Sequence, residues 1–172
     1  MKNACTHIYY GEGKGKTTAA AGLCARSLGR GLRVLYCQFL KTGGSGEAVS
    51  LKRLGADVMA SSPTGKFIWD MNGIEKTAFF TCQQELFDRA IQYISTGLVD
   101  VAVLDEALDA AEMGIFPFSR LAELISKKGN TELILTGRRP GPLLEKAEYC
   151  TEMRCTAHPY RQGQTARPGI EF

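Results

Sequence analysis

The residues of this chain best suited to chemistry form a glycine-rich stretch close to its start. Its glycines let backbone N–H groups turn inward around an anion, and a following helix would add partial positive charge. We therefore expect it to bind the phosphates of a nucleotide triphosphate, above all Mg-ATP, with Lys16 on the outer phosphates and the Thr17 hydroxyl on Mg²⁺. Every residue of the stretch is a candidate ATP ligand: Gly11, Glu12, Gly13, Lys14, Gly15, Lys16, Thr17 and Thr18.

The stretch departs from the usual phosphate-loop pattern G-x-x-x-x-G-K-[ST]. Tyr10 stands where the first glycine of that pattern belongs. The alternative is a glycine-rich turn without a ligand. The context favours a phosphate loop, because an apolar run leads into the stretch and a helix-forming segment follows it.

A pair of acids, Asp105 and Glu106, follows the apolar run at residues 101–104. In phosphate-loop proteins an acid at such a strand end holds Mg²⁺, directly or through water. We expect Asp105, Glu106 and Thr17 to be the metal ligands. Glu106 has two further interpretations, as a group that orients water for ATP hydrolysis or as a plain surface acid. The predicted catalytic residues are Lys16, Thr17 and Glu106.

A parallel sheet would bring the loop and the acids together. Apolar runs alternate with helix-period segments along the chain, which indicates a mostly parallel sheet of about six strands with helices on both faces. The expected fold class is α/β and P-loop NTPase-like, with ligands at the carboxyl ends of the strands. Strands are predicted at residues 5–10, 32–39, 56–60, 99–104, 132–135 and 149–153, and helices at 17–28, 79–95, 117–128 and 142–147.

Bulk properties narrow the class of protein. The 172 residues suit one domain, 1–172, with a sizeable core. A net charge of +3 from scattered Lys and Arg argues against nucleic acid as a partner. The N-terminus lacks an apolar signal core and no apolar run would span a bilayer, so a cytoplasmic protein without a membrane partner is expected. The six cysteines form no C-x-x-C pair and are interpreted as buried, reduced thiols.

Several segments, in order along nearly the whole chain, resemble one protein family. They are the glycine-rich stretch with Ala19-Ala20, Arg33-Val34-Leu35 leading to Gln38-Phe39-Leu40-Lys41, Val103-Leu104-Asp105-Glu106, Leu135-Thr136-Gly137-Arg138, Thr151-Glu152-Met153-Arg154, His158-Pro159 and Gly169-Ile170-Glu171-Phe172. The set resembles the P-loop family of ATP:corrinoid adenosyltransferases, also called cob(I)alamin adenosyltransferases. That family's loop has the same G-x-G-K-G-K-T-T form, which accounts for Tyr10.

The resemblance implies a transferase that moves the 5′-deoxyadenosyl group of ATP onto the cobalt(I) of cobalamin or a corrinoid precursor. Inorganic triphosphate is then the leaving group, ATP and the reduced corrinoid are the substrates, and Mg²⁺ is the cofactor. The corrinoid supplies the nucleophile, so no nucleophilic side chain is needed. A homodimer is also expected, together with a reductase partner whose identity stays open, as do the preferred corrinoid and the choice between synthesis and salvage.

Four other candidate residues come from the resemblance or from their places after predicted strands. Phe67 and Trp69 match a family segment, G-F-x-W, whose aromatics pack beside the corrin and help remove the lower axial ligand of cobalt, although Lys66 stands where its glycine would precede Phe67. The alternative is a pair of ordinary core aromatics. Arg138 is either an ATP ligand or a surface arginine, and Lys41 is a weaker phosphate candidate. Because the chain begins almost at its first predicted strand, we expect no N-terminal segment over the site of the kind some relatives carry.

Two rival functions remain compatible with a phosphate loop and a metal acid. One is a small-molecule kinase or ATPase that moves the γ-phosphoryl group. The other is a nucleotide-dependent module that binds nucleic acid, which the scattered charge disfavours.

Overall fold

The sheet has six parallel strands in the order β3-β2-β4-β5-β1-β6. The computed structural model describes residues 3–66, 68–159 and 163–170. The predicted α/β, P-loop NTPase-like fold is confirmed, and each of the six predicted strands is present with ends that shift by one or two residues. The strands are β1 (Thr6–Tyr10), β2 (Val34–Gln38), β3 (Asp57–Ala60), β4 (Val101–Asp105), β5 (Glu132–Thr136) and β6 (Tyr149–Glu152).

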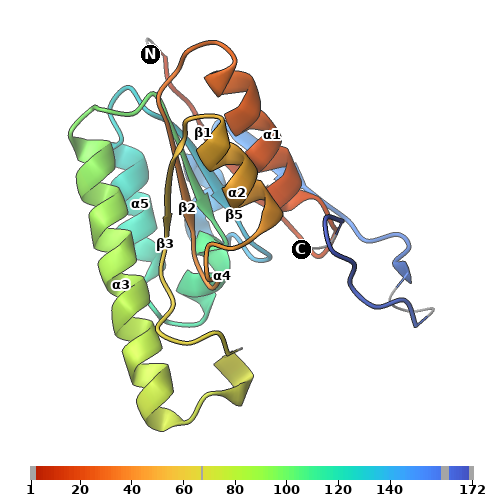
Figure 1. Ribbon diagram of the computed structural model, residues 1–172. Coiled ribbons are helices and arrows are strands. Elements are labelled where there is room, and N and C mark those ends of the chain that lie inside the picture. The colour runs from red at the N-terminus through yellow and green to blue at the C-terminus, as the bar shows by residue number, and fades with distance from the viewer. Residues whose placement is uncertain (1–2, 67, 160–162, 171–172) are drawn as a thin grey trace.

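Helices cover both faces of the sheet (Figure 1). One face carries α1 (Lys16–Leu28) and α2 (Gly46–Arg53), and the other carries α3 (Gly73–Ser95) and α5 (Phe118–Lys127). The short α4 (Ala107–Glu112) follows β4, and two 3₁₀ helices, η1 (Ile68–Asp70) and η2 (Gly141–Lys146), lie in connections. In the described ranges no helix combines the length and apolarity needed to cross a bilayer.

The core consists of two layers, one on each side of the sheet. Side chains alternate between the faces of a strand, so β2 sends Val34 and Tyr36 toward α1 and Leu35 and Cys37 toward α3. All five residues of β2 are buried. This explains why the strand appears in the sequence as a continuous apolar run rather than an alternating one.

Helix α3 begins six residues earlier than the periodicity predicts. Its start is fixed by a capping box, in which the Asn72 side chain accepts a hydrogen bond from the Glu75 N–H and the Glu75 carboxylate accepts one from the Asn72 N–H, both at 2.9 Å. The apolar stripe used for the prediction begins only at Phe79, which is the first buried residue of the helix.

The prediction of six buried thiols is correct only in part. Cys24 and Cys37 are buried, whereas Cys150 is exposed, and all six cysteines are free. Cys150 lies on β6, the edge strand, where all four residues are exposed. An edge strand has a neighbour on one side only, so an apolar residue there need not be covered.

Candidate active site

The glycine-rich stretch forms the connection from β1 to α1, at the carboxyl ends of the parallel strands, which we call the carboxyl edge of the sheet. Helix α1 starts at Lys16, and Gly15 before it has a left-handed φ of 116°. The loop is tied to two segments far away in sequence, because the Gly11 N–H donates to the Arg138 carbonyl at 3.0 Å and the Gly13 N–H donates to the Met153 carbonyl at 2.6 Å. Backbone hydrogen bonds to residues outside the loop therefore fix its conformation.

Two of the loop glycines are required by this packing. A Cβ on Gly13 would lie 2.6 Å from the carbonyl carbon and oxygen of Met153, and one on Gly11 would lie 2.6 Å from the same oxygen. Real Cβ atoms do not approach backbone atoms so closely. From the sequence alone, these glycines are explained by the need to bind an anion. The backbone of Met153, which follows β6, gives a second reason, because a side chain on either glycine would clash with it.

Lys16 folds back over the loop. Its ammonium group donates to the carbonyls of Gly11 and Gly13, at 2.7 and 2.8 Å. Burial lowers the pKa of Lys16, and the nearby carboxylate of Asp109 opposes that shift. Phosphate oxygens would offer the same ammonium group a charged partner in place of these carbonyls. Glu12, Lys14 and Thr18 are exposed on the rim of the loop.

Asp105 joins the loop to the acidic strand end. Its carboxylate is fully buried, and one oxygen accepts hydrogen bonds from the hydroxyls of Thr17 at 2.9 Å and Thr136 at 2.7 Å. Strands β1 and β4 are not neighbours, since β5 lies between them. Thr136 at the end of β5 fills that gap, and the structure brings Thr17 and Asp105 together as the sequence predicts.

The oxygens of Thr17 and Asp105 fit a hard divalent cation. Mg²⁺ prefers hydroxyl, carboxylate and phosphate oxygens and takes only one or two ligands from the protein in nucleotide sites. Across the described ranges no three His, Cys, Asp or Glu residues gather into a metal-binding group. A metal at this place would accordingly draw on Thr17, Asp105 and the phosphates, with Glu106 beside them.

Glu106 occupies the position between β4 and α4 with a strained backbone. Its φ is 60°, in the left-handed region that non-glycine residues rarely adopt, and its N–H donates to the Thr136 hydroxyl at 2.9 Å. Burial raises the pKa of its carboxyl group, and Lys41, whose ammonium group lies 3.4 Å from that carboxylate, lowers it. The side chain is 31% exposed and faces the same edge as the loop.

Several polar residues join this site although the sequence gave them little or no weight. Lys41 contacts Asp105 and Glu106, and Glu47 pairs with Lys41 at 3.4 Å. Gln38 donates to the Glu47 carboxylate at 2.9 Å, and the Arg138 N–H donates to the Asp109 carboxylate at 3.1 Å. A glutamine at the end of an apolar strand was an available signal for Gln38. Asp109 gave none, because it lies on the unpredicted helix α4.

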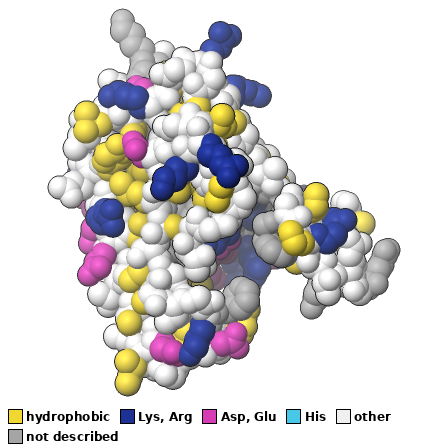
Figure 2. All heavy atoms as spheres, in the orientation of Figure 1, with side chains coloured by type: hydrophobic (Ala, Val, Ile, Leu, Met, Phe, Trp, Pro, Cys, Tyr) yellow, Lys and Arg dark blue, Asp and Glu magenta, His cyan; other side chains and the backbone are white. Residues whose placement is uncertain are grey.

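The side chain of Arg138 lies at the protein surface, and its role as an ATP ligand stays a prediction. It is 68% exposed, and its Nε lies 3.9 Å from the carboxylate of Glu12, which is equally exposed. Its backbone, in contrast, is part of the loop's support through the bond to Gly11. In Figure 2 a recess opens between the main body and the C-terminal segment, and charged side chains of both signs lie within it.

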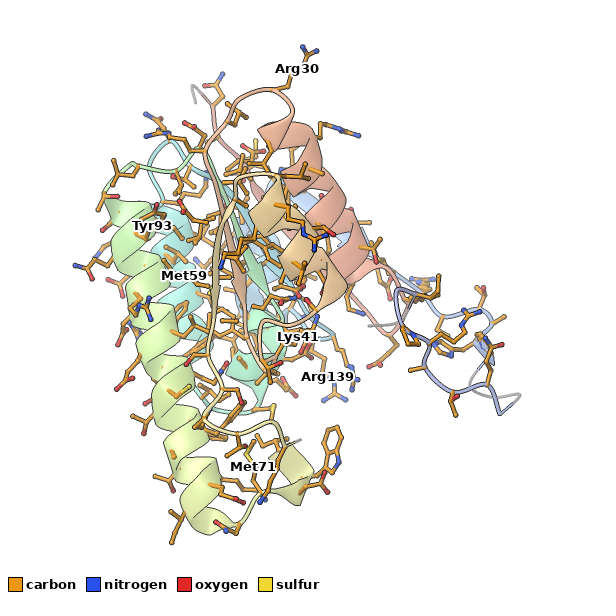
Figure 3. The ribbon with its side chains drawn as sticks, in the orientation of Figure 1. Arg30, Lys41, Met59, Met71, Tyr93 and Arg139 are labelled. Carbon is orange, nitrogen blue, oxygen red and sulfur yellow. The ribbon has the colours of Figure 1, made fainter. Side chains whose placement is uncertain are left out.

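The predicted corrinoid segment lies away from the phosphate loop, between β3 and α3. Trp69 on η1 is 72% exposed, so it is not a core aromatic, while Phe67 lies outside the described residues. Met71, only 5% exposed, anchors the segment in the core, and Figure 3 shows it at the same end of the molecule as Lys41. Lys66 and Glu75 form an ion pair of 2.5 Å across the base of the segment.

Comparisons with known proteins agree with the segments that carry the resemblance. The family model described as ATP:corrinoid adenosyltransferase BtuR/CobO/CobP matches residues 2–172. A corrinoid adenosyltransferase of Pseudomonas aeruginosa is 30% identical over 96% of this chain and 82% of its own length. Over the same share of this chain and 84% of their own lengths, a corrinoid adenosyltransferase of Escherichia coli K12 is 29% identical and corrinoid adenosyltransferase CobA of Salmonella typhimurium is 30% identical.

Proposed function

The chain belongs to the ATP:corrinoid adenosyltransferase family, and on that premise we propose that its phosphate loop holds the triphosphate of ATP as a leaving group. The enzyme is an ATP:corrinoid adenosyltransferase, with ATP and a corrinoid as substrates. The observation that carries the proposal is the hydrogen bond of 2.9 Å between Thr17, at the start of α1, and the buried Asp105. This bond supports a single site that includes the loop, its lysine and the acidic strand end.

In this proposal the chain's own residues bind and neutralise the triphosphate. The loop amides and the start of α1 face the phosphates, and Lys16 leaves the carbonyls of Gly11 and Gly13 to pair with them. Thr17 and Asp105 would hold Mg²⁺, with Glu106 beside them, and the bound metal would supply positive charge for the triphosphate.

The bond changes then take place at the ribose. The cobalt(I) of the corrinoid attacks the 5′ carbon of ATP, a cobalt–carbon bond forms, and the bond from that carbon to the α-phosphate oxygen breaks with its electron pair on triphosphate. Neither step requires a general base. Glu106 therefore serves charge and position in this proposal rather than activation of water.

The corrinoid is proposed to approach from the side of Trp69. An exposed indole gives a large flat apolar surface at low entropy cost, which suits contact with a corrin ring. Phe67 is proposed as the second aromatic of this contact on the strength of the sequence resemblance. A cytoplasmic location, a homodimer and a reductase partner stay predictions from the sequence.

The proposal is tested by the products of one reaction. The protein is incubated without oxygen with Mg-ATP and chemically reduced cobalamin, while visible spectra follow the corrinoid and phosphorus NMR follows the phosphates. We expect the spectrum of an alkylcobalamin together with one triphosphate for each molecule formed. Orthophosphate or ADP with an unchanged corrinoid spectrum would show a kinase or ATPase instead.

A further inference from the structure

Lys41 lies among three carboxylates at the carboxyl edge of the sheet (Figure 3). Its ammonium group is 3.1 Å from Asp105, 3.4 Å from Glu106 and 3.4 Å from Glu47. The side chain is 27% exposed. Lys41 thus touches both acids that the proposed function assigns to the metal.

The buried charge of Asp105 accounts for this contact. One carboxylate oxygen accepts hydrogen bonds from the Thr17 and Thr136 hydroxyls. The other accepts from the Lys41 ammonium group at 3.1 Å and, at 3.4 Å, from two neutral donors, the Tyr36 hydroxyl and the Gln38 amide. A fully buried carboxylate is strongly unfavourable unless a positive charge compensates it. Among the residues that the structure describes, the identified ion pair to Asp105 comes from Lys41.

The backbone around this cluster is shaped to hold it. Three non-glycine residues in the described part of the chain have positive φ, and two of them are Leu40 at 59° and Glu106 at 60°. Leu40 directly precedes Lys41, and its N–H donates at 3.0 Å to the side chain of Gln83, which is itself fully buried on α3. Strained residues persist where the surrounding structure fixes them, and they concentrate at functional sites.

We propose that Lys41 is an internal counter-ion that occupies the acids in the nucleotide-free enzyme and is displaced from them when Mg-ATP binds. This proposal rests on the proposed function, which assigns Asp105 and Glu106 to the metal site. Two cations cannot share the same oxygens at full charge without strong repulsion. Binding of Mg-ATP therefore breaks the ion pairs of Lys41 with Asp105 and Glu106. The flexible side chain then lets the ammonium group turn to the phosphates that enter beside Thr17.

Such a residue has opposite effects on two affinities, that for bare divalent metal and that for Mg-ATP. While ATP is absent Lys41 competes with a divalent cation, so binding of bare metal is weak. Once ATP is bound Lys41 adds a positive charge beside the triphosphate, so binding of the complex is strong. A purely structural lysine would instead weaken both kinds of binding when removed.

The test measures Mn²⁺ binding by paramagnetic resonance and Mg-ATP binding by calorimetry, with Lys41→Met compared with wild type. Without nucleotide, Lys41→Met should bind Mn²⁺ about tenfold more tightly, because one competing positive charge is gone. The same variant should bind Mg-ATP about tenfold more weakly, because one charge beside the phosphates is lost. Equal or weaker Mn²⁺ binding by Lys41→Met would overturn the proposal.

Two further variants keep the test decisive if Lys41→Met is poorly stable. Lys41→Arg retains the charge and should bind Mn²⁺ as wild type does, and Lys52→Met on the exposed face of α2 should leave both affinities unchanged. Thermal unfolding gives a separate readout, in which Mn²⁺ should raise the Tm of Lys41→Met more than that of wild type. An equal rise in both proteins would also count against displacement.

The outcome for Lys41 can be told apart from the outcome for the proposed function. If triphosphate and alkylcobalamin form while Lys41→Met leaves the metal titrations unaltered, only the role of Lys41 fails. If those products do not form, the proposed function itself fails.

Discussion

The phosphate loop and the segment at residues 61–72, of which the structure describes all but residue 67, are built in different ways, although both lie on the side of the carboxyl ends of the strands. The loop is bonded through its backbone to Arg138 beyond β5 and to Met153 beyond β6. Among its described residues, segment 61–72 contacts α3 through the hydrogen bond from the Gln83 side chain to the Ser61 carbonyl and the ion pair of Lys66 with Glu75, and Met71 packs into the core.

In the proposed function this difference corresponds to the two substrates. A triphosphate carries concentrated charge, and groups fixed in advance stabilise such charge without the cost of reorganisation. A corrin ring is broad and largely apolar, and it needs a surface that admits it and then closes. Trp69, 72% exposed, would provide such a surface in the proposed function. We therefore regard the loop as formed in advance and segment 61–72 as completed by its ligand.

The largest expected effect comes from Lys16→Ala. Removal of the ammonium group should lower kcat/KM on the order of 10²–10³-fold, because a preorganised charge on the leaving group is lost. The Tm should stay near that of wild type, since in the described part of the chain the hydrogen bonds of Lys16 run to loop carbonyls. Steady-state kinetics and thermal unfolding measure the two quantities. Lys52→Ala, on the exposed part of α2, is the control and should behave as wild type.

Asp105→Asn should rank second and affect stability as well as binding. The neutral amide leaves Lys41 without its buried partner and cannot accept from Thr17 and Thr136 as a carboxylate does. We expect a loss of about 3 kcal/mol in the free energy of unfolding, as for other broken buried pairs. Denaturant titration measures it, and ATP binding with and without Mg²⁺ should show a reduced effect of the metal. An unchanged Mg²⁺ effect would remove Asp105 from the metal site.

Gly13→Ala sharpens the claim that the loop is held by the segment after β6. The added Cβ would lie 2.6 Å from the backbone of Met153, so the free energy of unfolding should fall by about 1–3 kcal/mol. Gly22→Ala is the matched control on α1, where an added Cβ meets nothing within 4 Å, and it should raise stability by about 0.5–1 kcal/mol. Denaturant unfolding distinguishes the opposite signs. A neutral Gly13→Ala would mean that Met153 does not hold the loop.

Trp69→Ala should have the smallest effect on the phosphate half of the site. Calorimetry without corrinoid should give an ATP affinity within about twofold of wild type, because additivity holds for distant sites. Turnover from cobalt(II) with a weak reductant should fall more than turnover from preformed cobalt(I). Leu98→Ala, another exposed apolar residue, serves as the control. Equal losses from the two cobalt states would contradict a role in removing the axial ligand.

The sequence predicted those parts of the molecule that local patterns encode. Apolar runs located the six strands, and Gly-Lys-Thr followed by a helix located the loop. Short helices without an apolar stripe, such as α2, escaped detection because periodicity needs length. The contacts of Gly13 with Met153 and of Lys41 with Asp105 join residues far apart in the chain. Such contacts depend on the order of strands in the sheet, which no local pattern specifies.

The most direct test of the comparison is hydrogen exchange of the two segments, followed by mass spectrometry. In the protein without ligands, peptides that cover residues 10–18 should exchange slowly and those that cover 61–72 should exchange quickly. ATP should change the first set only slightly, and a corrinoid added with ATP should protect the second set strongly. Fast exchange of the loop in the free protein, or full protection of residues 61–72 before any corrinoid is added, would contradict the account.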